Sequence, residues 1–395
     1  TGEVQKVEMI DDVTKVEITK TDITTGEPVI GAQLSIIPVN EDGTLDEGAT
    51  FDTWITGEEP HYIQQLPVGK YVLREVLGQA SEYGYVTAND VEFEVLDTGE
   101  IQKVDMDDDY TTTEFSKVDT EGEAVEGAVM AIVPLDDEGN PLYGETFDTW
   151  MTMADDPETE DVDESIHVVE YLPIGKYQLV ELTAPDGYVK ALPVEFEVKD
   201  TAEVQQFFMV EKQVAFTKTD VTGEEEIPGA HIEVKDENGN TVDEWVSTDE
   251  SHPISGLEEG KEYTLIEVVA PDEYVKAEEI TFVVDTEKTD QHVEMQDKQV
   301  FITKTDITNG EEIPGAELTV TDKETGEIVD QWTSTTEAHP VSGLEEGKTY
   351  ILIEVQAPNG YEIAESIEFE VSYDKVIQHI EMMDAPYTTI QVNKV

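Results

Sequence analysis

A short segment built around one lysine recurs four times along the chain. It reads Ile-Thr-Lys-Thr-Asp at 18–22, Phe-Ser-Lys-Val-Asp at 115–119, Phe-Thr-Lys-Thr-Asp at 216–220 and Ile-Thr-Lys-Thr-Asp at 302–306. The copies lie about 86 to 101 residues apart, which is the size of an immunoglobulin-like β-sandwich. Because each repeat of a self-similar chain is one structural unit, we expect a tandem array of four such units.

Segments in which apolar and polar residues alternate follow each lysine. One reads Glu-Leu-Thr-Val at 317–320, directly after a Gly-Ala pair that every unit contains, and another reads Val-Glu-Phe-Glu-Val at 91–95. Alternation with period two predicts strands with one buried face. No segment sustains a period of 3.6 residues between helix caps, so we predict an all-β fold with few and short helices.

The closing segment of each unit sets the expected domain boundaries. It reads Met-x-acid, which places domains at 13–109, 110–211, 212–297 and 298–384, the second with an acidic insertion. Residues 1–12 resemble a closing strand and residues 385–395 an opening strand, each without its domain. We therefore expect a longer natural array, or ends that associate between molecules. The short joins predict a stiff array.

The charge of the chain excludes two classes of partner. It has 93 acidic against 22 basic residues and a formal net charge of -71, which repels nucleic acid and anionic membranes. The hydrophobic fraction of 38% nevertheless indicates folded domains. There is no cysteine, so disulfides and thiolate metal sites are excluded. No apolar stretch has the length of a membrane span.

Three polar residues recur in register within the strands of each unit. They are the lysine of the first strand, a glutamate at the end of the strand that contains Tyr-x-Leu or a similar sequence (called the Tyr-rich strand), and the acid of the closing strand. The acid follows the glutamate by about 30 residues in three units and by about 33 in the first. If the first and last strands are neighbours, lysine and acid face each other in the core, and the glutamate comes from the opposite sheet.

Burial would give this trio its chemistry. Desolvation disfavours every charged form, so it favours a neutral amine beside a protonated carboxyl, a pair that can condense to an amide. The glutamate would transfer the proton. The alternative interpretation is ordinary salt bridges or exposed strand residues.

Five motifs together resemble a known family. Thr-Lys-Thr-Asp, Pro-Gly-Ala, Gly-Lys-Tyr-x-Leu-x-Glu, Ala-Pro-x-Gly-Tyr and Met-x-Asp look like the collagen-adhesin B-type (Cna-B), or SpaA-like prealbumin-like, domain of Gram-positive surface adhesins and pilins. The resemblance covers nearly the whole chain. It implies immunoglobulin-like sandwiches with intramolecular isopeptide bonds, assisted by a catalytic glutamate, in three sets: Lys20 with Glu75 and Asp108, Lys218 with Glu267 and Asp297, and Lys304 with Glu354 and Asp384.

The second unit departs from the family pattern. Glu211 stands where Asp or Asn is expected beside Lys117 and Glu181. One extra methylene displaces the carbonyl, and a displacement of about 1 Å can cost on the order of a hundredfold in rate. The pair of Lys117 and Glu211, and the catalytic role of Glu181, are therefore doubtful, with a salt bridge as the alternative. Asp11 and Lys394 are expected to have no partner within this chain.

Metal and cofactor sites are not expected. His61, His167, His252 and His339 each lie five residues before a leucine, and this spacing indicates a repeated structural position more than metal ligation. Calcium remains the less favoured alternative for the acidic insertion at 155–161, whose other interpretation is a solvated loop. Phe-Asp-Thr-Trp at 51–54 and 147–150 favours tryptophans packed on the sandwich edge over exposed ligand-binding ones.

These features predict a structural stalk or spacer of a bacterial cell-surface adhesin or pilus-like protein, located outside the cell. It is not an enzyme, because each cross-link forms once. The alternative is a set of binding modules that recognise a host protein or glycan through loops of the first two domains. The expected partners are flanking domains of the same chain, with host protein, glycan and end-to-end self-association as further ones.

Overall fold

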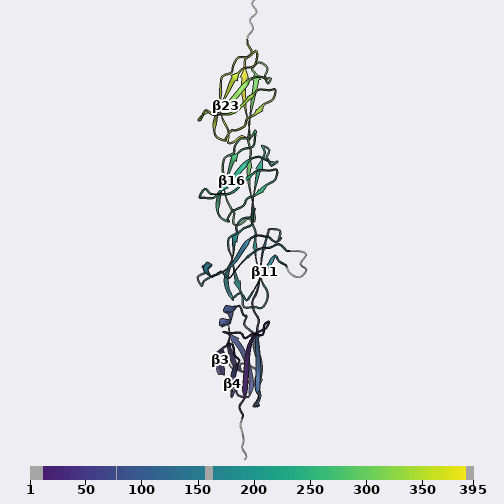
Figure 1. The fold of residues 1–395 in the computed structure, drawn as a ribbon, viewed down its shortest axis with the longest axis vertical. Helices are drawn as coiled ribbons and strands as arrows, with labels where there is room; N and C mark the ends of the chain where they lie inside the picture. The colour runs from purple at the N-terminus through teal and green to yellow at the C-terminus, as the bar shows by residue number, and fades with distance from the viewer. Residues whose placement is uncertain (1–11, 77, 156–162, 388–395) are drawn as a thin grey trace, which may run out of the picture. The chain divides into compact units, whose positions relative to one another are not determined.

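The structure is a computed structural model that describes residues 12–76, 78–155 and 163–387 of the 395-residue chain. Within these ranges there is no α-helix, and the helical segments are the short 3-10 turns η1 (Glu47–Ala49), η2 (Gln79–Tyr83) and η3 (Tyr143–Glu145). All other regular segments are β-strands (Figure 1). This confirms the predicted all-β fold class.

The strands of the first domain form two sheets. The three-stranded sheet has the order β4 (His61–Gln64), β1 (Lys15–Asp22) and β7 (Ile101–Asp108). The four-stranded sheet has the order β3 (Asp52–Ile55), β2 (Gln33–Pro38), β5 (Gly69–Val76) and β6 (Val91–Val95). Apolar side chains of both sheets, such as Ile18 and Leu34, share one buried cluster, so the domain is a two-layer sandwich.

The same topology recurs in the other three domains. In domain 2 the sheets are β11 (Ile166–Glu170), β8 (Thr112–Val118), β14 (Gln205–Val210) and β10 (Asp148–Met151), β9 (Val129–Pro134), β12 (Gly175–Thr183), β13 (Val194–Val198). In domain 3 they are β18 (His252–Pro253), β15 (Gln213–Thr219), β21 (Asp290–Gln296) and β17 (Thr241–Val246), β16 (His231–Lys235), β19 (Glu262–Val269), β20 (Ile280–Val283). In domain 4 they are β25 (His339–Pro340), β22 (Gln299–Asp306), β28 (Ile377–Asp384) and β24 (Ile328–Thr333), β23 (Glu317–Asp322), β26 (Thr349–Gln356), β27 (Ile367–Glu370).

Contacts divide the chain into two compact units. The first holds domains 1 and 2, and the second holds domains 3 and 4 together with the loop Thr183–Leu192.

The first and last strands of every domain are parallel neighbours. In domain 1, β1 pairs with β7 so that Lys20 lies opposite Met106, and in domain 3 Lys218 lies opposite Met295. The closing acid follows two residues after this methionine, on the same face of its strand. This register brings the closing acid beside the lysine, as the alternation of apolar and polar residues requires.

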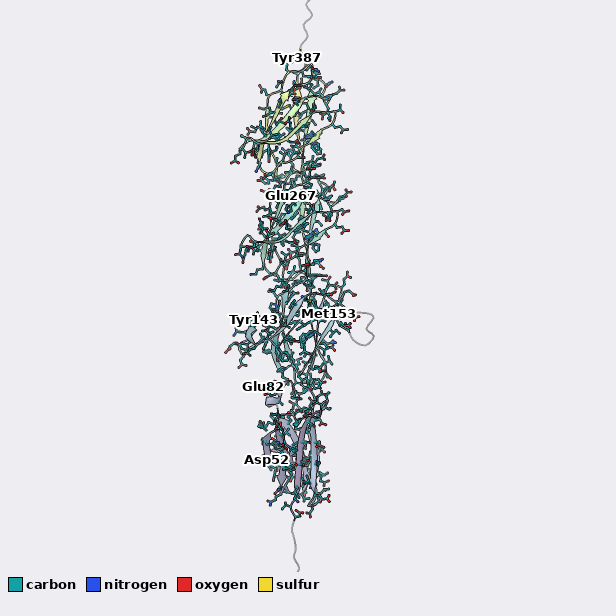
Figure 2. All side chains as sticks on the ribbon, viewed as in Figure 1. Asp52, Glu82, Tyr143, Met153, Glu267 and Tyr387 are labelled. Carbon is teal, nitrogen blue, oxygen red and sulfur yellow. The ribbon has the colours of Figure 1, made fainter. Side chains whose placement is uncertain are left out.

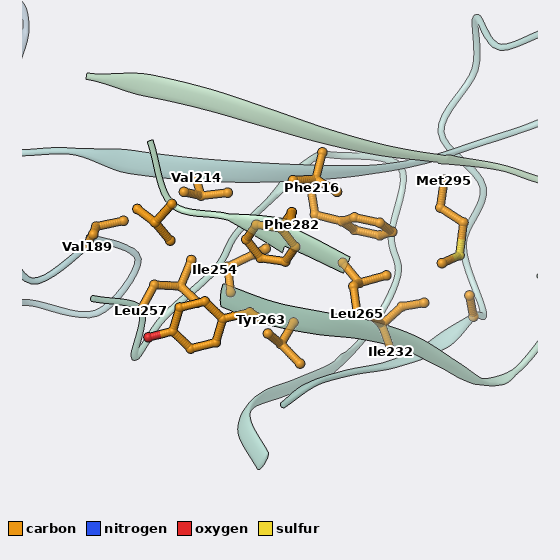
Figure 3. Packing of buried hydrophobic residues seen from close by; sticks show 14 residues of the cluster. Val189, Val214, Phe216, Ile232, Ile254, Leu257, Tyr263, Leu265, Phe282 and Met295 are labelled. Carbon is orange, nitrogen blue, oxygen red and sulfur yellow. The ribbon is translucent and has the colours of Figure 1, made fainter. Parts of the chain in front are cut away.

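The core of domain 3 shows what surrounds these polar residues. Phe216, Ile232, Leu265 and Met295, drawn in Figure 3, come from four strands of both sheets and are almost fully buried. A charged group placed among such side chains has little access to water, so its ionised form is disfavoured.

Candidate functional site

A buried lysine in domain 3 contacts two carboxyl groups. Lys218 Nζ lies 3.0 Å from Glu267 Oε1 and is hydrogen-bonded to Asp297 Oδ1. All three side chains have no exposed surface. Lys218 comes from β15, Asp297 directly follows β21, and Glu267, labelled in Figure 2, comes from β19 of the opposite sheet.

Domain 1 holds the same arrangement. Lys20 Nζ lies 3.1 Å from Glu75 Oε2 and is hydrogen-bonded to Asp108 Oδ1. The three side chains are at most 3% exposed.

Domain 4 repeats it a third time. Lys304 Nζ lies 3.0 Å from Glu354 Oε1 and is hydrogen-bonded to Asp384 Oδ1, again with at most 1% exposure. The residues named from sequence for domains 1, 3 and 4 thus lie together in three separate cores. A surface salt bridge is excluded for these residues by their burial.

The glutamate of each trio is held by the backbone. One of its oxygens, Oε2, accepts a hydrogen bond from the N–H of Ala88 in domain 1 (2.7 Å), Ala277 in domain 3 (2.6 Å) and Ala364 in domain 4 (2.7 Å). In domains 3 and 4 this leaves Oε1 toward the lysine, whereas in domain 1 Oε2 makes both contacts. A fixed carboxyl keeps its proton-accepting oxygen within reach of the amine.

Burial shifts the pKa of the closing aspartates. Desolvation raises the pKa of Asp108 and of Asp297 to about 7, although the neighbouring lysine opposes this change. Burial also raises the pKa of Asp384. A raised pKa means that the protonated, uncharged carboxyl is populated near neutral pH, and this is the form from which water can leave.

Domain 2 has the lysine and the glutamate but a longer closing acid. Lys117 Nζ lies 3.3 Å from Glu181 Oε1, and neither side chain is exposed. Lys117 lies opposite Met209 in the parallel pair, so Glu211 occupies the position that Asp297 has in domain 3. Glu211 is buried as well, with 1% exposure. The other two predicted residues, Asp11 and Lys394, lie outside the described residues.

A second repeated cluster was missed in the sequence. In domain 3, His252 Nε2 lies 3.0 Å from Asp243 Oδ2, and its ring stacks on Trp245 with centroids 3.9 Å apart. The same trio recurs in the other domains as Asp52, Trp54 and His61; Asp148, Trp150 and His167; and Asp330, Trp332 and His339. The signal was an Asp-x-Trp motif in all four repeats.

This cluster joins the edges of the two sheets. Asp243 and Trp245 lie on β17, an edge strand of the four-stranded sheet, and His252 lies on β18, an edge strand of the other. Burial alone would raise the pKa of Asp243, but hydrogen bonds from His252 and from the N–H of Ser255 hold it below its ordinary value. The histidine therefore has a structural partner in each domain.

No group of three or more potential metal-ligating side chains gathers within the described ranges. The acidic insertion considered for calcium falls almost wholly on residues 156–162, outside those ranges. Within the same ranges, no helix has the length and apolarity that crossing a membrane would require.

The fold and the buried trio define a class of repeated two-sheet domains with parallel first and last strands. A model of the SpaA family, described as a prealbumin-like fold domain, matches this chain four times, at residues 14–110, 111–211, 212–299 and 298–386. The chain therefore belongs to the SpaA family, which confirms the resemblance seen in its motifs.

Three of the solved structures to which this chain is similar come from bacteria. The Bacillus anthracis TIE protein is 20% identical, with 96% of this chain and 76% of that chain covered and a TM-score of 0.26. The Streptococcal ancillary pilin is 14% identical, with 95% and 100% covered and a TM-score of 0.31. The shaft pilin SpaA from Lactobacillus rhamnosus GG is 11% identical, with 46% and 99% covered and a TM-score of 0.23. No curated protein matches the chain in sequence.

Proposed function

We propose that the chain is a structural spacer of a bacterial cell-surface protein, stiffened by isopeptide bonds that join Lys20 to Asp108, Lys218 to Asp297 and Lys304 to Asp384. The observation that carries the proposal is the contact of a buried lysine with a buried aspartate and a buried glutamate in each of three domains.

The chemistry is a condensation within the folded domain. The neutral amine of Lys218 attacks Cγ of protonated Asp297, so that a C–N bond forms and a C–O bond breaks. Glu267 accepts a proton from the nitrogen and gives it to the departing hydroxyl, which leaves as water. Burial supports this step because it raises the pKa of Asp297 and so favours the protonated carboxyl from which water can leave. Each domain reacts once, so the chain is not an enzyme.

Two properties of the whole sequence support an extracellular spacer. The chain has no cysteine, so an amide between first and last strands would replace the disulfides that commonly brace extracellular domains. The net charge of -71 makes separate chains repel one another and so resists their aggregation. Neither property depends on the function of a relative.

The alternative function, recognition of a host protein or glycan by the first two domains, called for exposed tryptophans in their loops. Trp54 is instead partly buried against the core of domain 1 and stacked on His61. Trp150 likewise stacks on His167 and contacts Phe115. The geometry of these residues therefore favours the spacer function.

Intact-mass measurement of the full chain tests the proposal. We expect a mass lower than that of the sequence by three waters, one for each bond, and peptide mapping should find each lysine joined to its aspartate. A folded sample without any water loss would exclude the isopeptide bonds.

A further inference from the structure

A loop with the sequence Ser-Gly-Leu-Glu-Glu-Gly precedes the Tyr-rich strand in domains 3 and 4. It spans 255–260 in domain 3 and 342–347 in domain 4, whereas domains 1 and 2 have Leu-Pro-Val-Gly and Leu-Pro-Ile-Gly there. The first serine of the loop donates its N–H to the aspartate that pairs with the histidine, Asp243 in domain 3 and Asp330 in domain 4. This contact does not account for the two glutamates or for the glycines, which require another explanation.

The backbone of this loop pairs with the neighbouring domain. In the second unit, the N–H of Lys276 of domain 3 donates to Leu344 O of domain 4 (2.8 Å), and the N–H of Glu346 donates back to Lys276 O (3.2 Å). The N–H of Glu273 donates to Ser342 Oγ (3.0 Å). The loop of domain 4 thus receives an extended segment of domain 3 through backbone hydrogen bonds, as an added strand would be received.

A valine of that segment completes the core of the next domain. Val275, between the turn of domain 3 and Lys276, is 1% exposed and belongs to the same buried cluster as Val300, Val341 and Leu344 of domain 4. Burying a valine side chain removes apolar surface from water, so this contact attracts the two domains to each other.

An ion pair lies beside the backbone hydrogen bonds between the two domains. Lys298, which follows the closing acid of domain 3, forms an ion pair with Glu346 Oε1 and donates to Tyr373 O. Glu346 Oε2 accepts from the N–H of Glu278 (3.3 Å). The lysine and glutamate side chains are only 19% and 8% exposed. A hydrogen bond from Tyr373 to Glu278 raises the pKa of the phenol and adds a further link.

The glycine of the motif is required by the same contact. Gly347 has a φ of +73°, and a Cβ at this position would collide with the ring of Tyr373. A larger residue would therefore push Tyr373 away from Lys298 and Glu278. The Glu-Glu-Gly sequence is thus suited to this junction in both charge and shape.

The second unit contains a second copy of the junction. Val189 lies in the buried cluster of domain 3 beside Leu257 (Figure 3), and the N–H of Lys190 donates to Leu257 O (2.8 Å). Lys212 forms the ion pair with Glu259, whose Oε2 accepts from the N–H of Leu192 (2.9 Å). The same contacts, a buried valine and an ion pair between lysine and glutamate, thus occur at two junctions. This repetition indicates that the contacts are a regular feature of junctions with this loop.

The junction inside the first unit is built differently. The residue after the closing acid of domain 1 is Asp109, and the loop of domain 2 offers Tyr171, whose Oη donates to Asp22 Oδ2 (2.7 Å) and whose ring stacks on Tyr110. This junction uses tyrosines, and it has Asp109 and Ile174 at the positions that correspond to the lysine and the glutamate of the second unit.

We propose that the Ser-Gly-Leu-Glu-Glu-Gly loop is a docking surface that selects, as its neighbour, a domain of this family with a Val-Lys segment after its turn and a lysine after its closing acid. The backbone pairing and the valine supply attraction, and the lysine supplies the selectivity, because Glu346 or Glu259 would be buried without a counter-charge beside a neighbour lacking it. Domains of the Leu-Pro type cannot form this ion pair.

Hydrogen exchange of the full chain tests this docking surface. In Glu346→Gln and in Lys298→Met, we expect the amides of Lys276, Glu278 and Glu346 to exchange faster, on the order of tenfold or more, because a charge-assisted contact is lost. Exchange in β22 should not change, and the proposed loss of one water at Lys304 and Asp384 should remain, which separates this result from a failure of the isopeptide bonds.

Glu368→Gln and Lys323→Met are matched controls. These residues form an ion pair on the exposed surface of domain 4, with 2.5 Å between Lys323 Nζ and Glu368 Oε1. If exchange at Lys276, Glu278 and Glu346 is the same in the test and control variants, the docking surface is refuted. Peptide mapping that finds Lys298 joined to Glu346 by an amide would also overturn the ionic selection proposed here. Faster exchange in both test variants and neither control would establish it.

Discussion

At the scale of single residues, the glutamate of each buried trio is the group on which cross-linking should depend. It is held by a backbone N–H, such as that of Ala277 for Glu267, in addition to its contact with the lysine. Removing it leaves the amine and the acid in contact but removes the group that would transfer the proton.

We therefore expect the Glu267→Ala chain to lose two waters from its own sequence mass instead of three, without unfolding of domain 3. The free energy of unfolding of that domain should fall by about 4 kcal/mol, by analogy with a disulfide that closes a loop of similar length. Glu262→Ala, at an exposed position of the same strand, is the control. A loss of three waters from the sequence mass of the variant, as in the wild type, would show that Glu267 is dispensable.

The raised pKa of the closing aspartate predicts a pH dependence in a chain that cannot cross-link. Lys218→Met leaves Asp297 buried with an acid pKa of about 7 or higher, against an ordinary value of 3.8. Because the folded pKa is raised, stability is fully present below the unfolded pKa and is lost as pH rises through the folded one. We expect the urea concentration at which half of domain 3 is unfolded to decrease as the pH is raised from about 4 to about 7. Proteolysis of the unfolded fraction measures this midpoint.

The control for this pH dependence is Lys261→Met, which replaces an exposed lysine and leaves the proposed bond intact. An amide does not titrate, so the urea midpoint of domain 3 in the Lys261→Met variant should not fall in the same way as the pH rises. Equal pH trends in the two variants would contradict the assignment of the titrating group to Asp297.

At the scale of strands, the parallel pairing of the first and last strands decides which acid reaches the lysine. In domain 2 this pairing, β8 with β14, has the same register as in the other domains, with Met209 opposite Lys117. The difference in domain 2 is thus confined to the length of one side chain, that of Glu211.

Glu211→Asp should restore the carbonyl position found in the other domains. We expect one further water to be lost from the intact mass, and a peptide in which Lys117 is joined to residue 211. Glu211→Gln, which keeps the longer side chain, should lose none. Absence of a bond in the aspartate variant would mean that something other than side-chain length prevents the reaction.

At the scale of the whole molecule, the four domains should differ in resistance to unfolding. The proposal gives domain 2 no covalent tie, so we expect hydrogen bonds and packing alone to hold this domain together. The tie that the others are proposed to have is worth about 4 kcal/mol.

Limited proteolysis of the intact chain should therefore cut residues 110–211 first, most readily in the acidic segment at 155–164, because exposed polar loops are the usual sites of cleavage. The expected order can be read from the masses of the fragments over time. Equal survival of domain 2, or continuous electron density between Lys117 and Glu211, would show that it is already cross-linked.

The sequence by itself determined the features that repeat with a local period. The spacing of the lysine segments predicted the four family domains, and alternation of apolar and polar residues predicted strands with one buried face. The same alternation placed Lys20, Glu75 and Asp108 on inward faces, since side chains two residues apart in a strand share a face.

Only the tertiary structure decided the contacts between loops and edges. The stacking of His252 on Trp245, the N–H that holds Glu267, and the insertion of Val275 into the next domain join segments that no local period relates. Which residues are in contact here depends on how the two sheets pack and where the loops leave the strands. A pattern along the chain identifies the residues but does not predict these contacts.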